Sequence, residues 1–574
     1  MKFLFGTAFA KTAMAAALSL CCGAAVSADG LSGSYLAGRH AATIADVDQA
    51  GRYFARALAR DPGNPGLMEQ ALVYQTAAGR VEQALSLARD LIDIQPDHRL
   101  SALVLTAEDI RAGNLDAAQA RLSATPEAFH PLVGALLSAW TAHGLRQFEK
   151  VESAFESLDD RTIIQVFAGY HLGLIRLAED DVPAAEAAFD KAMGLLSAPT
   201  GRMARGYAAM LRRADRKDEA RKVYERAMSI AVGDAVLERE LSTLAAGEPA
   251  LMAVSTPADG AAEALFGLAS ALGQEGGKRL SLFYTRLALH LRPDFSDAAL
   301  LTAELLEDQE QFALAVKAYE SIDATNPHSR AAEIGRAEAL HRMGEDDKAV
   351  EALQQLTRRS PEAVDAHIAL GDLMRRIQRF AEGAQAYDVA VDLMAAADRE
   401  TWVLYYQRGI TLERSDQWER AEADFFKALE LSPDQPLVLN YLGYSWLEKG
   451  LNLEKALPMI QKAVDQRPDD GYIVDSLGWA YYLRGDFENA VVELERAVEL
   501  RPVDPVINDH LGDALWQVGR RLEAEFQWKR AMSFEPDAHD AIRIKRKLQV
   551  GLDQVLEEET VSDPEAAETV KDDG

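Results

Sequence analysis

Cysteine is almost absent from this 574-residue sequence, which contains only Cys21 and Cys22. Both lie within the first 28 residues, so removal of that segment would leave a chain without a thiol. This excludes disulfides and cysteine metal sites from the remainder. Such a chain can still fold, because 48% of its residues are hydrophobic and 26% are charged, a composition typical of a soluble folded protein.

Charged residues are absent from positions 12–28, which are mostly small or apolar. Lys2 and Lys11 place positive charge before this stretch, and it ends in Val-Ser-Ala at Ala28, the small-x-small pattern that a signal peptidase requires. The stretch is short for a membrane span. We therefore predict a signal peptide over residues 1–28 and a periplasmic mature protein.

The two cysteines leave one alternative open for this N-terminal segment. An outer-membrane lipoprotein carries its lipid on a cysteine that normally follows a small residue, whereas Cys21 follows Leu20 and Cys22 follows Cys21. Cleavage after Ala28 is therefore favoured over lipidation. Contact with a membrane is expected only if one of these cysteines is lipidated.

Basic residues are too few to balance the acidic ones. The 61 lysines and arginines face 91 aspartates and glutamates, which gives a formal net charge of −30. A surface of that sign repels phosphate backbones. We therefore expect protein partners and exclude nucleic acid.

Motifs of catalysis and of metal or cofactor binding are missing as well. The sequence has no glycine-rich phosphate loop, no nucleophile elbow and no histidine pair at metal spacing, and its 11 histidines are dispersed from His40 to His539. We expect no catalytic residue, no metal and no cofactor, and hence a protein that is not an enzyme.

A repeat occupies most of the chain. Abundant Ala, Leu, Glu and Arg favour helices, and a small residue recurs at intervals of 33–38 residues with a single interval of 61. About 14 units result. Their small residues are Ala50, Ala84, Ala118, Val151, Ala185, Ala220, Ser281, Ala315, Ala349, Gly383, Ala421, Ala456, Ala490 and Ala524.

The units resemble the tetratricopeptide-repeat (TPR) family, in which each unit is a helix-turn-helix hairpin. The unit that begins near Gly471 carries the pattern in full: Leu477-Gly478 in the first helix, Ala490 and Leu494 in the second, and Pro502 at its end. Glycine and alanine remove bulk where the two helices cross, and proline ends the second helix. The resemblance implies an all-α superhelical solenoid.

The repeat boundaries predict the domain organisation. The interval of 61 falls at a proline- and glycine-containing stretch, which we interpret as an insertion or hinge between two arrays. The predicted parts are a signal peptide (1–28), an N-terminal array (31–234), the insertion or hinge (235–261), a C-terminal array (262–537), a capping helix (538–556) and an acidic disordered tail (557–574).

The resemblance also implies where a partner would bind. In TPR proteins the first helix of each unit lines the inner surface, and positions 2, 5, 9 and 12 of the unit usually face inward. In the last four units these positions predict an aromatic, acidic groove for a basic or amine-bearing peptide. The groove residues are Tyr406, Asn440, Tyr444, Tyr472, Asp475, Trp479, Tyr482, Asp509, Asp513 and Trp516.

Packing is the competing interpretation of the aromatic residues. We assign Trp402, Trp446 and Trp528 to the core, and we expect Trp479 and Trp516 equally to pack or to anchor a ligand. A lone histidine such as His510 is more often structural. The basic run over 543–547 precedes an acidic tail and predicts a solvated or intramolecularly paired face.

The C-terminal repeats are similar to those of large proteobacterial envelope TPR proteins. One branch of that group comprises outer-membrane lipoproteins that bind a C-terminal-processing protease and deliver cell-wall hydrolases to it. The resemblance therefore implies a periplasmic scaffold or adaptor whose partners are other envelope proteins or extended peptide segments. The alternative is a scaffold for polysaccharide export or outer-membrane assembly.

Overall fold

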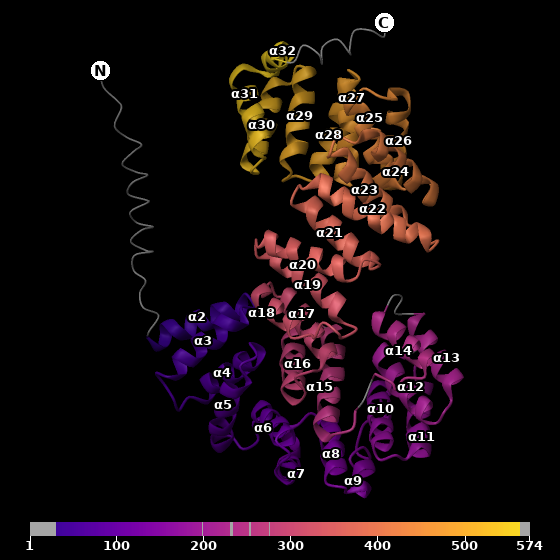
Figure 1. The fold of residues 1–574 in the computed structure, drawn as a ribbon. Helices are drawn as coiled ribbons and strands as arrows, with labels where there is room; N and C mark the ends of the chain where they lie inside the picture. The colour runs from indigo at the N-terminus through magenta and orange to yellow at the C-terminus, as the bar shows by residue number, and fades with distance from the viewer. Residues whose placement is uncertain (1–29, 198, 230–233, 252–253, 275, 563–574) are drawn as a thin grey trace. The chain divides into compact units, whose positions relative to one another are not determined.

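The computed structural model describes residues 30–562 except 198, 230–233, 252–253 and 275. The predicted signal peptide and most of the predicted tail lie outside these residues. The described chain is helical throughout and contains no strand, which confirms the predicted all-α class (Figure 1). It divides into two compact units, unit 1 up to Arg359 and unit 2 from Ser360.

The helices of unit 1 follow one another with short turns. They are α2 (Leu31–Thr43), α3 (Val47–Leu58), α4 (Pro65–Ala77), α5 (Val81–Ile94), α6 (Arg99–Arg111), α7 (Leu115–Ala124), η1 (Pro126–Ala128), α8 (Pro131–Gly144), α9 (Phe148–Ser153), α10 (Thr162–Ala178), α11 (Val182–Gly194), α12 (Gly201–Arg213), α13 (Lys217–Met228), α14 (Ala235–Ala246), α15 (Pro257–Gln274), α16 (Lys278–Leu291), α17 (Ser296–Glu307), α18 (Phe312–Glu320), α19 (Ser329–Arg342) and α20 (Asp346–Arg359).

Unit 2 continues the same pattern of paired helices. Its helices are α21 (Val364–Arg376), α22 (Phe380–Ala396), α23 (Trp402–Glu413), α24 (Trp418–Leu431), α25 (Pro436–Glu448), α26 (Leu453–Gln466), α27 (Gly471–Leu483), α28 (Phe487–Leu500), α29 (Pro505–Gln517), α30 (Arg521–Ser533), α31 (Ala538–Val550) and α32 (Leu552–Ser562).

Each hairpin is closed by a small residue under a large one. A Cβ atom added to Gly409 of α23 would lie 2.7 Å from the ring of Phe425 on α24, so the two helices approach as closely as glycine permits. The same large residue reaches the next hairpin, because the ring centroid of Phe425 lies 5.3 Å from that of Tyr441 on α25. This double use of one side chain explains the 34-residue period.

The residues that cap the helices differ from the simplest expectation. The aspartate directly after the unit-ending proline, such as Asp469, does not cap the next helix. Instead Asp470 accepts the backbone N–H of Tyr472 at 3.2 Å, and Asp504 accepts those of Val506 and Ile507 at 3.0 Å. The carboxylates satisfy N–H groups that no carbonyl of the helix can reach.

Helices α15 and α16 do not simply extend the row of hairpins. They pack on α4, α6 and α8, which are first helices of earlier hairpins. The Nε of Arg286 on α16 donates to the carbonyl oxygen of Ala77 at 3.1 Å, and His290 Nε2 lies 2.7 Å from Glu108 Oε2. These first helices thus lie against a later part of the same chain.

The contact between α15 and α8 depends on a glycine. A Cβ atom on Gly260 would lie 1.9 Å from the indole of Trp140, which is fully buried. The Nε1 of Trp140 donates to Nδ1 of His171 on α10 at 3.0 Å. Burial lowers the pKa of His171 to about 4, which keeps this acceptor nitrogen unprotonated.

The compact units do not coincide with the two predicted arrays. Residues 235–246 form helix α14, and the helices after the predicted insertion pack back on α4–α8, so the boundary between the units falls at 359/360. Whether 235–261 acts as a hinge stays a prediction.

The C-terminal cap is two helices where we predicted one. Gly551, at φ +84°, separates α31 from α32, and α32 continues to Ser562, so the first six residues of the predicted tail are helical. Ile544, Leu552 and Val555 are buried as predicted, but Ile542 is 71% exposed. No described helix has both the length and the apolar character needed to cross a membrane.

Candidate protein-binding groove

The first helices of successive hairpins in unit 2 place equivalent residues side by side. Helix α27 contacts both α25 and α29, so the rows predicted from the repeat run across neighbouring helices. In one row Asn440 donates through Nδ2 to the hydroxyl of Ser476, the residue after Asp475, at 3.2 Å. The repeat register therefore places these groups on one continuous face.

Trp479 lies at the centre of this face, between two other rings. Its ring centroid is 4.5 Å from that of Tyr482 and 4.0 Å from that of His510, with interplanar angles of 8° and 16°. Both faces of the indole are therefore covered by protein. A ligand can reach the edge of Trp479 but cannot stack on it, which corrects the expectation of a flat aromatic anchor.

His510 also forms an ion pair with a predicted groove residue. Its Nδ1 lies 3.0 and 3.1 Å from the two carboxylate oxygens of Asp475, and both side chains are largely buried. Burial alone would lower the pKa of His510, but the carboxylates of Asp475, Asp509 and Asp513 outweigh it and raise this pKa. His510 therefore fastens α29 to α27.

Asp509 and Asp513 do not form an open acidic wall, contrary to the prediction. The Nζ of Lys547 on α31 lies 2.8 Å from Asp509 Oδ2 and 2.6 Å from both oxygens of Asp513, and Lys547 and Asp513 are 1% and 0% exposed. Arg543 adds a contact of 3.2 Å to Asp513. Burial and the neighbouring Asp513 raise the pKa of Asp509. The carboxylates are neutralised within the chain.

Trp516 is covered from the same side. A Cβ on Gly551, between α31 and α32, would lie 2.6 Å from its ring, and the ring of Trp528 lies 5.3 Å away. The guanidinium of Arg521 stands 4.7 Å above the Trp516 ring. Trp516 thus belongs to the capped end of unit 2, as does Trp528, whose predicted core position is confirmed by its full burial.

The basic run that precedes the tail explains this capping. Arg543 and Lys547 pair with the aspartates of α29, and Arg546 pairs with Glu558 of α32 at 2.6 Å. Intramolecular pairing, one of the two predicted alternatives, is thereby confirmed for these three side chains. Lys545 is exposed.

Toward α23 the face is less covered. Tyr472 is 53% exposed, and its ring lies 4.9 Å from the guanidinium of Arg501. Tyr406 is half-buried and packs edge-on against Tyr441 at 6.0 Å. Burial raises the pKa of Tyr406 to about 12, so its hydroxyl stays protonated at neutral pH and can donate a hydrogen bond.

Two carboxylates of this open part were missed from the sequence. Glu448 stands at the end of α25 beside Tyr444, and loss of hydration, together with the charge of Glu413, raises its pKa. Glu413 accepts the hydroxyl of Tyr441 at 3.3 Å and pairs with Lys449 at 3.4 Å. Glu448 is the position after the last inward position of the predicted register, a neighbour that a one-residue-wider pattern would have included.

The ten predicted residues thus separate into two groups. Tyr406, Asn440, Tyr444 and Tyr472 lie on the less covered part of the face, on α23, α25 and α27. The others are covered by ring stacking or by α31. They are Asp475, Trp479, Tyr482, Asp509, Asp513 and Trp516.

The repeats themselves are matched by family models. Residues 334–398 and 406–470 match a model described as tetratricopeptide repeat, and residues 478–519 match one described as TPR repeat. These matches confirm TPR repeats in this part of the chain.

Individual relatives are distant. A TPR repeat-containing protein of Pseudomonas aeruginosa is 24% identical over 194 residues, which cover 32% of this chain and 31% of that protein. Human tetratricopeptide repeat protein 13 is 26% identical over 142 residues, which cover 25% and 16%. The chain therefore spans less than a third of the length of either relative.

Solved structures give similar matches along most of the chain. A chain of the APC/C hetero-tetramer Cut9–Hcn1 is 14% identical with a TM-score of 0.37, covering 90% of this chain and 96% of that one. Yeast Tom70 is 13% identical with a TM-score of 0.35, covering 94% and 99%.

Proposed function

We propose that this TPR-containing chain is a non-catalytic scaffold or adaptor of the bacterial cell envelope. It binds extended segments of other exported proteins on the inner face of α23, α25 and α27. The observation that supports this is the row of Tyr406, Tyr444 and Tyr472 with Glu448 on successive first helices, where the rest of unit 2 leaves aromatic surface and a carboxylate accessible.

The chemistry of this face favours a basic segment with apolar side chains. Among the described residues no cation lies within 4 Å of the Glu448 carboxylate, so an incoming lysine or arginine would supply the missing counter-charge. The exposed Tyr472 ring offers surface to a neighbouring apolar side chain.

The sequence features of the first 28 residues support a periplasmic location for this scaffold. A C-terminal-processing protease is one candidate partner, with cell-wall hydrolases as the cargo. The second candidate function is a scaffold for polysaccharide export or outer-membrane assembly, for which the same groove would hold a component of that machinery.

Cross-linking in cells followed by affinity purification separates these functions. We expect the wild-type protein to recover a protease together with wall hydrolases. The variant Tyr472→Ala/Glu448→Lys should lose them, because it removes an exposed ring and reverses an exposed charge without entering the core. The control Phe526→Ala removes a 60% exposed ring from α30, a second helix, and should retain every partner.

Other results would reject parts of this proposal. Recovery of glycan-export or outer-membrane-assembly components alone would establish the second function. Equal recovery by the wild type and the groove variant would remove the groove assignment.

Membrane fractionation of Cys21→Ala/Cys22→Ala tests the anchor. If the wild type is a lipoprotein, it sediments with outer membranes and the variant does not. We expect both to be soluble after cleavage.

A further inference from the structure

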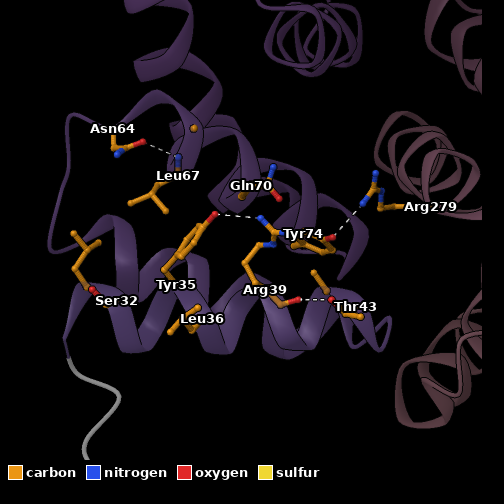
Figure 2. A pocket seen from close by; sticks show the side chains of 13 residues that line it. Ser32, Tyr35, Leu36, Arg39, Thr43, Asn64, Leu67, Gln70, Tyr74 and Arg279 are labelled. Carbon is orange, nitrogen blue, oxygen red and sulfur yellow. Dashed lines mark hydrogen bonds between the residues drawn. The ribbon is translucent and has the colours of Figure 1, made fainter.

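We infer that unit 1 carries a second binding site, of opposite charge, for an acidic segment of a partner protein that also contains apolar side chains. The site is a hollow of about 920 Å³ between α2 and α4, with Arg279 of α16 at its edge (Figure 2). This inference rests on unit 1 alone and is independent of the groove proposed in unit 2.

The hollow is the part of the inner face of unit 1 that α15 and α16 leave open. On the repeat register Gly38 is the glycine of the first helix, so Tyr35 and Arg39 occupy its inward positions 5 and 9. From α4 onward the first helices pack on α15 and α16. The neighbouring hairpin that would cover α2 is therefore absent from this end of the described chain.

The charge of the hollow is exceptional for this protein. None of its 13 lining residues is acidic, whereas the chain as a whole has a net charge of −30. Arg39 and Arg279 both line it, and neither forms an ion pair with a described carboxylate. Each donates only to a tyrosine hydroxyl, Arg39 to Tyr35 at 3.2 Å and Arg279 to Tyr74 at 3.3 Å. Both guanidinium groups thus keep most of their donors available for a carboxylate.

Apolar side chains surround these cations. Leu31, Tyr35 and Leu36 line the hollow and are 40%, 37% and 65% exposed. In Figure 2 Tyr35 and Arg39 point from α2 toward α4, where Gln70 and Tyr74 face them. A ligand that fills such a site presents carboxylates and apolar groups within a few residues of each other. An extended acidic and apolar peptide has this chemistry.

Selection from a peptide display library on the immobilised full-length mature protein tests the site. We expect enrichment of sequences in which Asp or Glu lies next to Leu or Phe. An enriched peptide, synthesised with both ends blocked, should bind at least about tenfold more tightly than its analogue with Gln in place of Glu, as measured by calorimetry.

The matched variants decide the location. Arg39→Gln/Arg279→Gln should lose the enrichment and weaken the blocked peptide at least about tenfold. Arg89→Gln removes the same charge from an exposed position of α5 and should bind as the wild type does. The variant Tyr472→Ala/Glu448→Lys of unit 2 should also bind normally, which separates a failure here from a failure of the proposed function. All three must unfold at the wild-type temperature.

The inference is overturned if acidic sequences are not enriched, or if the double-arginine variant binds the selected peptide unchanged. It is also overturned if millimolar inorganic phosphate displaces the peptide as effectively as free peptide does, since the site would then recognise a simple anion.

Discussion

Single buried charges decide which part of the unit 2 face is accessible. Lys547 and Arg543 occupy, one repeat later, the positions of Asp513 and Asp509, being 34 residues further along in each case. The cap helix α31 therefore presents cations where the preceding first helix presents carboxylates. The sequence contained this signal, but a pattern of inward positions predicts only direction, and it does not show that the next helix covers them.

Lys547 can be tested at this scale. Lys547→Met should lower the free energy of unfolding by about 3–5 kcal/mol, because it leaves the fully buried Asp513 short of counter-charge. Denaturation by urea measures this loss. Lys545→Met changes the exposed lysine two residues away and should have little effect. Adding Asp513→Asn to Lys547→Met should restore part of the loss; no restoration would show that the pair does not act as proposed.

The His510–Asp475 pair makes stability depend on pH. Because the folded pKa of His510 is raised above 6.5, its contribution is fully present below pH 6.5 and is lost as the pH rises through the folded pKa. The groups that face it are Asp475 on α27, Asp509 and Asp513 on α29, and Glu448 on α25.

Urea unfolding at several pH values measures this contribution. His510→Gln should be most destabilising at pH 5.5–6.5 and progressively less so above that range. His539→Gln, at an 87% exposed side chain, should show no such trend. A difference between wild type and His510→Gln that grows with pH would contradict the assignment.

At the scale of elements, the hairpins were predictable and the return of α15 and α16 was not. The contact of Gly409 with Phe425 lies within one hairpin, so it recurs with the period and is visible in sequence. The contact of Arg286 with Ala77 joins residues 209 apart and belongs to no period. The same reason explains why the boundary at 359/360 was missed.

Gly260 tests the packing of α15 on α8. Gly260→Ala should destabilise unit 1 by at least about 2 kcal/mol, because the added methyl group would overlap the buried indole of Trp140 and force the two helices apart. Thermal unfolding detects the change. Gly194→Ala is the matched control, since nothing lies within 4 Å of its Cβ position. Equal stability of the two variants would show that α15 does not pack tightly on α8.

At the scale of the whole molecule, the two units should unfold differently. In unit 2 the helices contact mainly their neighbours in sequence, so local opening can begin at an end of the stack and proceed hairpin by hairpin. In unit 1 the contacts of α15 and α16 with α4, α6 and α8 tie distant hairpins together, so opening one exposes the core of several.

Hydrogen exchange followed by mass spectrometry distinguishes these behaviours. We expect the amides of α4, α6, α8, α15 and α16 to exchange at one common rate, and those of unit 2 to show graded rates along the stack. Gly260→Ala should accelerate exchange across all five helices together while leaving α23–α30 unchanged. Acceleration confined to α15 would mean that unit 1 is also a simple linear stack, in which each hairpin opens without its distant neighbours.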